Sequence, residues 1–240
     1  MEPSQQQPRI RAYALTPEDV QREQAAFMAQ VYGWMMVALL ITATVSIWTA
    51  ATPELLNVVV GNRLVFYGLI LGEIGMVVWL SAAVQRMSAI MATGLFLGYA
   101  AVNGLTLAVI FTVFTGGSIA STFFITAGMF GAMSAFGYFT KRDLTSWGSL
   151  LFMALIGLIL ASVVNFFLHN EMLYWITSFA GVLIFVGLTA YDTQKIKEMN
   201  VIGNAGTDED RKEAIMGALT LYLDFINLFL YLLRFFGRRK

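Results

Sequence analysis

The sequence contains no cysteine and only one histidine. The lack of cysteine excludes disulfides, thiol nucleophiles, zinc–thiolate sites and iron–sulfur clusters. A single histidine, His169, is not expected to form a metal site alone, because such sites need several ligands. A polar residue in a short loop is the simpler interpretation. The formal net charge is zero, so bulk charge indicates no nucleic-acid partner.

Charged residues are also scarce, at 12% of 240 residues, whereas 58% are hydrophobic and the mean hydropathy is +0.70. No ordinary soluble domain of this size has that composition. The first residues, MEPSQQQPRIRAYAL, lack the apolar core of a signal peptide. The composition therefore predicts an all-α, polytopic membrane protein.

The N-terminal region differs from the rest of the chain. Residues 1–15 are polar and contain proline, which is typical of a flexible tail. Thr16 suits a helix N-cap, Pro17 suits the first helical position, and two acidic residues follow. We therefore divide the chain into residues 1–25, a polar tail with the start of the first helix, and residues 26–240, a transmembrane domain.

Seven apolar segments approach the roughly 20 residues that a helix needs to cross the hydrocarbon core of a membrane. They cover residues 31–51, 64–84, 88–112, 118–139, 146–168, 172–191 and 213–234. Among their connections, only 192–212 is long enough to carry a polar loop. The pattern predicts one compact helical bundle.

Positive charges indicate the orientation of the bundle. A cytoplasmic N-terminus places ten Lys and Arg residues inside: Arg9, Arg11, Arg22, Arg86, Lys141, Arg142, Lys195, Lys197, Arg211 and Lys212. The outer loops then receive only Arg63. Seven crossings, however, place the four basic residues of 234–240 outside. Either the last helix is an exception to the rule, or it enters the membrane and returns to the inner side.

Three carboxylates lie within or at the edge of apolar segments: Glu73, Asp192 and Asp224. Ionisable residues in a membrane are costly and are usually functional. Glu73 has an alternative interpretation as a protonated packing residue, and Asp192 as an interfacial residue beside two lysines. Asp224, in LYLDFINLFLYLL at 221–233, is the hardest of the three to explain structurally.

Polar neighbours share the helix faces of these aspartates. Thr220 and Asn227 lie four residues before and three after Asp224, and Thr189 lies three residues before Asp192. If the two aspartates meet, their mutual repulsion favours sharing one proton. Calcium prefers six to eight oxygen ligands, so we expect a pH-responsive latch and only a weak calcium site. Because Asp224 lies deeper in its segment than Asp192, a direct contact requires helix tilt or a late crossing.

Three stretches resemble the Bax inhibitor-1, or transmembrane Bax inhibitor motif, family, in its bacterial inner-membrane branch. They include TKRDL at 140–144, GLTAYDTQK at 187–195 and LYLDFINLF at 221–229. The resemblance covers nearly everything after residue 25. It implies seven transmembrane helices with the last one surrounded by the other six.

The resemblance also implies a pH-sensitive calcium leak, with an aspartate pair as sensor and latch. By motif, these aspartates are Asp192 and Asp224. Some relatives carry a second-helix glutamate, which Glu73 matches, and an arginine that pairs with the latch. That arginine is expected at Ala83, and Arg86 lies one helical turn further on. The expected partners are the lipid bilayer and calcium as a permeant ion, without another cofactor.

Two alternative functions remain. An intramembrane aspartyl protease also has two aspartates on successive helices. However, such enzymes carry Gly-x-Gly-Asp where this chain reads LYLD, and no proline occurs after residue 53. We therefore expect no enzymatic activity. The second alternative is an interaction protein that modulates a membrane protease or a stress response through its polar tail.

Overall fold

The structure, a computed structural model, describes residues 16–240. The tail expected over residues 1–15 lies outside the described residues. The helices are α1 (Pro17–Ala51), α2 (Pro53–Leu56), α3 (Arg63–Ala83), α4 (Ala89–Leu107), α5 (Ile110–Val113), α6 (Gly116–Phe139), α7 (Thr145–Leu168), α8 (Glu171–Met199) and α9 (Asp208–Phe236). Seven of the helical segments are long and apolar enough to cross a membrane, which confirms the predicted all-α bundle.

The first helix begins where its sequence predicts. The Thr16 side chain accepts a hydrogen bond from the backbone N–H of Asp19, and the Asp19 carboxylate accepts one from Thr16 in return. Pro17 occupies the first helical position, where its missing N–H costs no helical hydrogen bond. This capping box fixes the start of α1.

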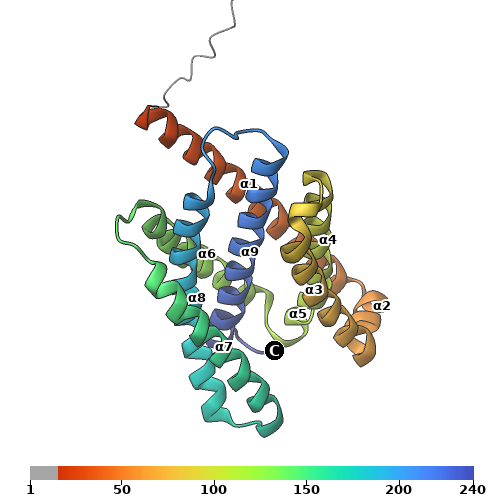
Figure 1. Cartoon of the computed structure of the whole chain (residues 1–240). Coiled ribbons are helices and arrows are strands. Elements are labelled where there is room, and N and C mark those ends of the chain that lie inside the picture. The colour runs from red at the N-terminus through yellow and green to blue at the C-terminus, as the bar shows by residue number, and fades with distance from the viewer. Residues whose placement is uncertain (1–15) are drawn as a thin grey trace, which may run out of the picture.

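Helix α9 is the centre of the bundle (Figure 1). Of its most apolar stretch, 67% is buried, compared with 6% for α7. α9 packs against α1, α4, α6 and α8, whereas α3 packs mainly on α4 and α7 mainly on α8. The central position of the last helix is therefore confirmed. Four helices surround it directly, and two stand outside these four.

Helix α8 extends beyond its predicted apolar segment. It continues through Asp192 and two lysines to Met199, and α9 already starts at Asp208. The predicted polar connection of 192–212 is therefore wrong in length, because hydropathy falls at Asp192 while the backbone stays helical. Seven helical residues follow Asp192, so it lies within the helix, not at its end.

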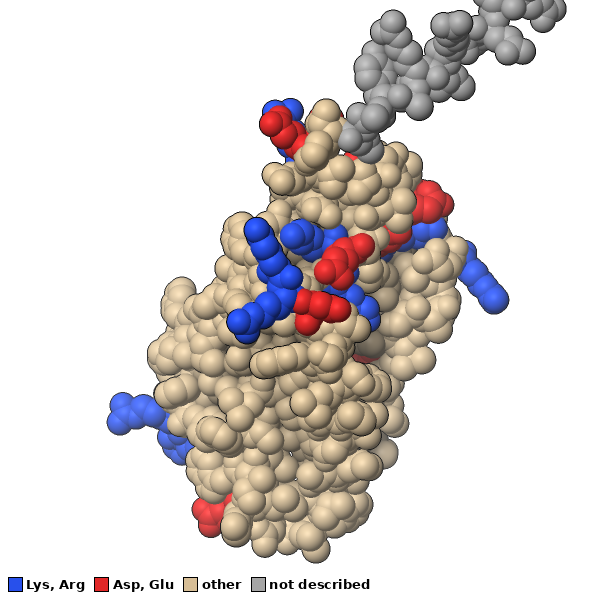
Figure 2. Space-filling model, turned by 60° about the vertical axis from the view of Figure 1, so that its left-hand side comes forward, with Lys and Arg blue, Asp and Glu red and all other residues tan. Residues whose placement is uncertain are grey.

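The surface is divided by polarity. Figure 2 shows charged side chains gathered toward one end of the bundle, beside a broad band with almost no charge. Many apolar side chains are exposed among the described residues, for example Phe152, Leu160 and Val163 on α7. Such a surface is stable against lipid but not against water.

The C-terminal tail after α9 is held against the connection between α5 and α6. The carbonyl of Arg238 accepts a hydrogen bond from the backbone N–H of Thr115 at 2.9 Å. The backbone N–H of Lys240 donates to the carbonyl of Val113 at 3.0 Å, and its side chain donates to the carbonyl of Phe111 at 2.6 Å. These bonds close the end of the bundle opposite the start of α1 (Figure 1).

Candidate functional site

Asp224 is buried in the middle of the central helix, with only 4% of its surface exposed. Its carboxyl group lies within hydrogen-bonding reach of the carboxyl group of Asp192 on α8. Within residues 16–240, no N–H or O–H group donates to Asp224 Oδ2. A hydrogen bond between two carboxyl groups requires a proton on one of them. The two aspartates therefore form a pair that can hold one proton between helices α8 and α9.

A cavity of about 670 Å³ lies beside this pair, between α7, α8 and α9. It exists because α7 packs on α8 and leaves this side of α9 uncovered. Both aspartates line it, together with polar or aromatic residues of all three helices: Ser149, Tyr191, Lys195, Thr220, Asn227 and Tyr231. The pair is thus buried toward the core and reachable from the cavity.

The predicted polar neighbours occupy different positions. Thr220 and Asn227 line the cavity beside Asp224, but each donates to its own helix, to the carbonyls of Met216 and Leu223 respectively. Their remaining lone pairs stay available to an ion or water. Thr189 is fully buried and donates to the carbonyl of Phe185. The structure therefore brings Thr220 and Asn227 to the cavity, and not Thr189.

Lys195 is a functional candidate that the sequence reasoning used only for topology and for an interfacial interpretation of Asp192. It lies one helical turn after Asp192, lines the same cavity, and its Nζ stands 5.6 Å from the ring centre of Tyr191. Its charge acts on the Asp192 carboxylate. The three-residue spacing on one helix could have indicated this cation as a partner of Asp192.

Glu73 belongs to a second polar cluster on another side of α9. Its carboxylate accepts hydrogen bonds from Thr106 Oγ1 at 2.6 Å and from Asn103 Nδ2 at 3.1 Å. Asn103 Oδ1 in turn accepts one from the hydroxyl of Tyr222 at 3.1 Å, and that hydroxyl is 2.7 Å from Thr42 Oγ1. Glu73 is thus connected to the central helix two residues before Asp224.

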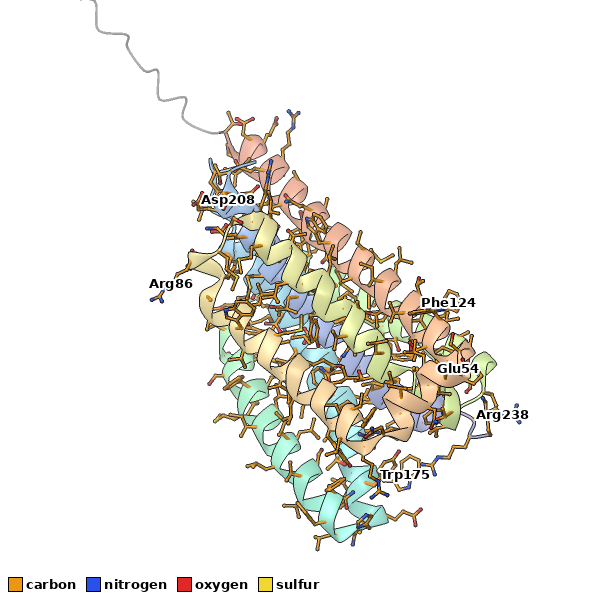
Figure 3. All side chains as sticks on the ribbon, turned by 90° about the vertical axis from the view of Figure 1, so that its right-hand side faces the viewer. Glu54, Arg86, Phe124, Trp175, Asp208 and Arg238 are labelled. Atoms are coloured by element: carbon orange, nitrogen blue, oxygen red, sulfur yellow. The ribbon has the colours of Figure 1, made fainter. Side chains whose placement is uncertain are left out.

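Arg86 does not join either cluster. It is exposed in a 3₁₀ turn at Val84–Arg86 and projects away from the bundle (Figure 3). It does not line the cavity beside the aspartates. In this structure the cation nearest to the pair in that cavity is Lys195, on the same helix as Asp192.

This arrangement suits proton exchange better than tight metal binding. No group of three or more acidic or histidine side chains within residues 16–240 could hold a metal ion. Two carboxylates with a hydroxyl and an amide nearby supply fewer oxygens than the six to eight that calcium prefers.

Known proteins match nearly the whole chain. The family model described as "Inhibitor of apoptosis-promoting Bax1" matches residues 24–240. The inner membrane protein YbhL of Escherichia coli K12 is 56% identical over 215 residues, covering 89% of this chain and 92% of that protein. An uncharacterized protein of Borreliella burgdorferi is 45% identical, covering 89% and 92% of the two chains. An uncharacterized membrane protein of Streptococcus pyogenes is 36% identical, covering 88% and 92%.

The matched region includes all seven candidate membrane helices and both aspartates. It begins inside α1 and extends through the C-terminal tail. On this evidence the chain belongs to the Bax inhibitor-1 family of membrane proteins.

Proposed function

We propose that this protein is a pH-sensitive cation leak, with calcium as the permeant ion, gated by the Asp192–Asp224 pair. One observation carries the proposal: two carboxyl groups face each other inside the membrane region, beside a cavity that also contains a lysine. Intramembrane carboxylates are costly to bury and commonly mark ion or proton pathways. The pair connects the central helix to only one of its neighbours, so its state affects how α8 and α9 pack.

The proton shared by Asp192 and Asp224 determines whether cation flux rises or falls with pH. At low pH the shared proton joins the carboxyl groups, and α8 and α9 stay in contact. As pH rises the pair loses that proton, and two negative charges in a poorly screened site repel each other. One aspartate then moves toward the cavity, where Lys195 neutralises it and a cation can approach the other. Flux should therefore rise with pH.

The direct test is calcium flux into proteoliposomes that contain only the purified protein, measured over about pH 6 to 8. Pairs of carboxylates in surroundings of low dielectric constant can titrate in this range. Flux that increases with pH supports the proposal. Vesicles without protein set the background. A protein that is folded and inserted, but conducts no cation at any pH in this range, would contradict it.

We also propose an orientation: a bacterial inner membrane with the N-terminus in the cytoplasm and the C-terminus outside. The relative from Escherichia coli is an inner membrane protein by name. The positive-charge pattern supports the inner position of the N-terminus. Seven candidate spans then place the C-terminal tail after α9 on the side of the membrane opposite to the N-terminus.

Reporter fusions test this orientation. Alkaline phosphatase fused after Lys240 should be active, and a fluorescent protein at the same place should be dark, because only the outer side permits phosphatase folding. Fusions to a chain truncated after Arg142, which follows four spans, should give the opposite pair of signals. A fluorescent fusion after Lys240 with an inactive phosphatase would overturn the seven-crossing topology.

Glu73→Gln should preserve insertion and folding but change the pH dependence of flux. Glutamine keeps the volume of the side chain and one acceptor, for Thr106, but it places an amide donor where Asn103 Nδ2 now donates, so the Asn103 amide has to turn to accept it. The substitution removes a negative charge that is connected through Asn103 to Tyr222 on the central helix α9. An unchanged pH profile in proteoliposomes would assign Glu73 a packing role only.

A further inference from the structure

Four basic residues lie at the C-terminal end of the bundle: Arg234, Arg238, Arg239 and Lys240. The orientation rule does not explain them, because it places positive charge on the opposite side. Within residues 16–240, the ion pairs all involve Lys212, so none of these four is within 4.0 Å of a carboxylate. Their charge is therefore available to a negatively charged ligand.

Arg234 is held rigidly but uses few of its hydrogen-bond donors. Its guanidinium lies 4.7 Å from the ring centre of Tyr231 and 5.2 Å from that of Tyr174. One nitrogen donates to Ser178 Oγ at 3.3 Å. A guanidinium has five N–H donors, and this is its one side-chain hydrogen bond within the described residues. The two cation–π contacts and the bond to Ser178 thus hold the guanidinium and leave its other donors free.

Arg239 reaches the same place from the tail. The backbone on both sides of it is fixed, since Arg238 accepts from Thr115 and Lys240 donates to Val113. The backbone of the tail is therefore held on both sides of Arg239. Arg234 and Arg239 therefore line one cavity from two different segments of the chain.

The site is a cavity of about 730 Å³ between the α7–α8 connection, the start of α8 and the end of α9. Arg234 and Arg239 line it, as do Glu171, Trp175 and Phe235. The rings of Trp175 and Phe235 pack 5.5 Å apart. Figure 3 shows Trp175 and Arg238 at the same end of the bundle, opposite Asp208. Aromatic side chains at this level are typical of the membrane–water interface.

Exposed apolar side chains continue from the cavity along the bundle. Phe166, Phe167 and Leu168 at the end of α7 are 61%, 74% and 65% exposed, and Met172 on α8 is 73% exposed. A ligand that contacts both regions needs a negatively charged head and apolar chains. A free anion would contact only the guanidiniums, whereas a lipid would contact both the guanidiniums and this apolar surface.

We propose that this cavity binds an anionic phospholipid of the leaflet on the C-terminal side, with its phosphodiester between Arg234 and Arg239. Guanidiniums match phosphate geometry through paired hydrogen bonds. The acyl chains lie along the exposed end of α7. Glu171 in the same cavity requires a headgroup with hydrogen-bond donors beyond the phosphate, and the hydroxyls of a glycerol headgroup supply them. Two guanidiniums against one carboxylate favour a net negative lipid such as phosphatidylglycerol.

The test is native mass spectrometry of the full-length protein in detergent, titrated with phosphatidylglycerol. Arg239→Gln should weaken binding by roughly tenfold, the effect of losing about 1.4 kcal/mol of charge-assisted hydrogen bonding. Arg238→Gln is the matched control, because it removes the same charge from the neighbouring position, which does not line the cavity. Arg234→Lys keeps the charge but loses the planar fork, and should also weaken binding. Thermal unfolding checks that the variants remain folded.

Four results would overturn the proposal. Equal weakening by Arg238→Gln and Arg239→Gln would indicate unspecific attraction to the whole face. Equal affinity for phosphatidylethanolamine would indicate a zwitterionic ligand. Displacement of the lipid by millimolar inorganic phosphate would indicate a free-anion site. Unchanged binding in the Arg239→Gln and Arg234→Lys variants would place the lipid elsewhere.

Discussion

Replacing Asp224 with asparagine is expected to abolish most of the dependence of calcium flux on pH while leaving the bundle folded. Asparagine has nearly the same size and can still hydrogen-bond to Asp192, but it does not titrate. In the wild type, one titrating proton can change the ratio of closed to open states by up to about tenfold per pH unit. In the variant this slope should approach zero between about pH 6 and 8.

Asp143→Asn is the matched control for this experiment. Asp143 is exposed in the connection between α6 and α7. Hydrogen bonds from the side chain and the backbone N–H of Thr145 hold the pKa of its carboxyl below its usual value. It therefore stays ionised throughout the measured range, and its replacement should leave the pH profile unchanged.

The partner aspartate extends the same test. Asp192→Asn should also flatten the profile, and the double variant should change less than the sum of both single effects, because coupled sites are not additive. The latch would be rejected if both single variants kept the wild-type profile. Loss of folded protein in both would be read from thermal unfolding before any flux is compared.

A large loss of stability is expected from Gly137→Ala. A methyl group at Gly137 on α6 would lie 2.1 Å from the backbone carbonyl oxygen of Ala190 on α8. A backbone oxygen cannot rotate away, so the two helices must separate. Overpacking of this kind typically costs about 1–3 kcal/mol, occasionally more. Because Ala190 lies two residues before Asp192, the displacement should also disturb the aspartate pair.

Gly131→Ala on the same helix provides the comparison. Nothing lies within 4 Å of a methyl group at Gly131, and alanine favours helix more than glycine does. This variant should keep or slightly raise the unfolding temperature in detergent, whereas Gly137→Ala should lower it clearly. Equal unfolding temperatures for the two variants would show that α6 and α8 do not approach as closely as described.

The sequence predicted the helices better than it predicted their ends. Long apolar runs indicate membrane helices independently of what packs against them, so all seven segments were predicted correctly. The end of α8 was predicted wrongly because hydropathy reports burial in lipid, and Asp192, Lys195 and Lys197 lower it while remaining helical. This extension removes the apparent mismatch in depth between Asp192 and Asp224.

The candidate site was predictable only in part. Family motifs pointed to Asp192 and Asp224, which the structure brings together. The cavity beside them was not predictable, because it depends on α7 leaving one side of α9 uncovered. The contact of Tyr222 with Asn103 and Thr42 joins three helices that are distant in the chain. No local pattern marks such a contact.

The central helix is also the last to be synthesised. The ribosome produces α1 to α8 before α9, so the four helices around α9 must at first enclose an unfilled slot, or stand apart. During this interval Thr42 and Asn103 lack the Tyr222 hydroxyl, and Asp192 lacks its partner carboxyl group. A chain that ends between α8 and α9 would therefore keep Thr42, Asn103 and Asp192 without their partners on the central helix.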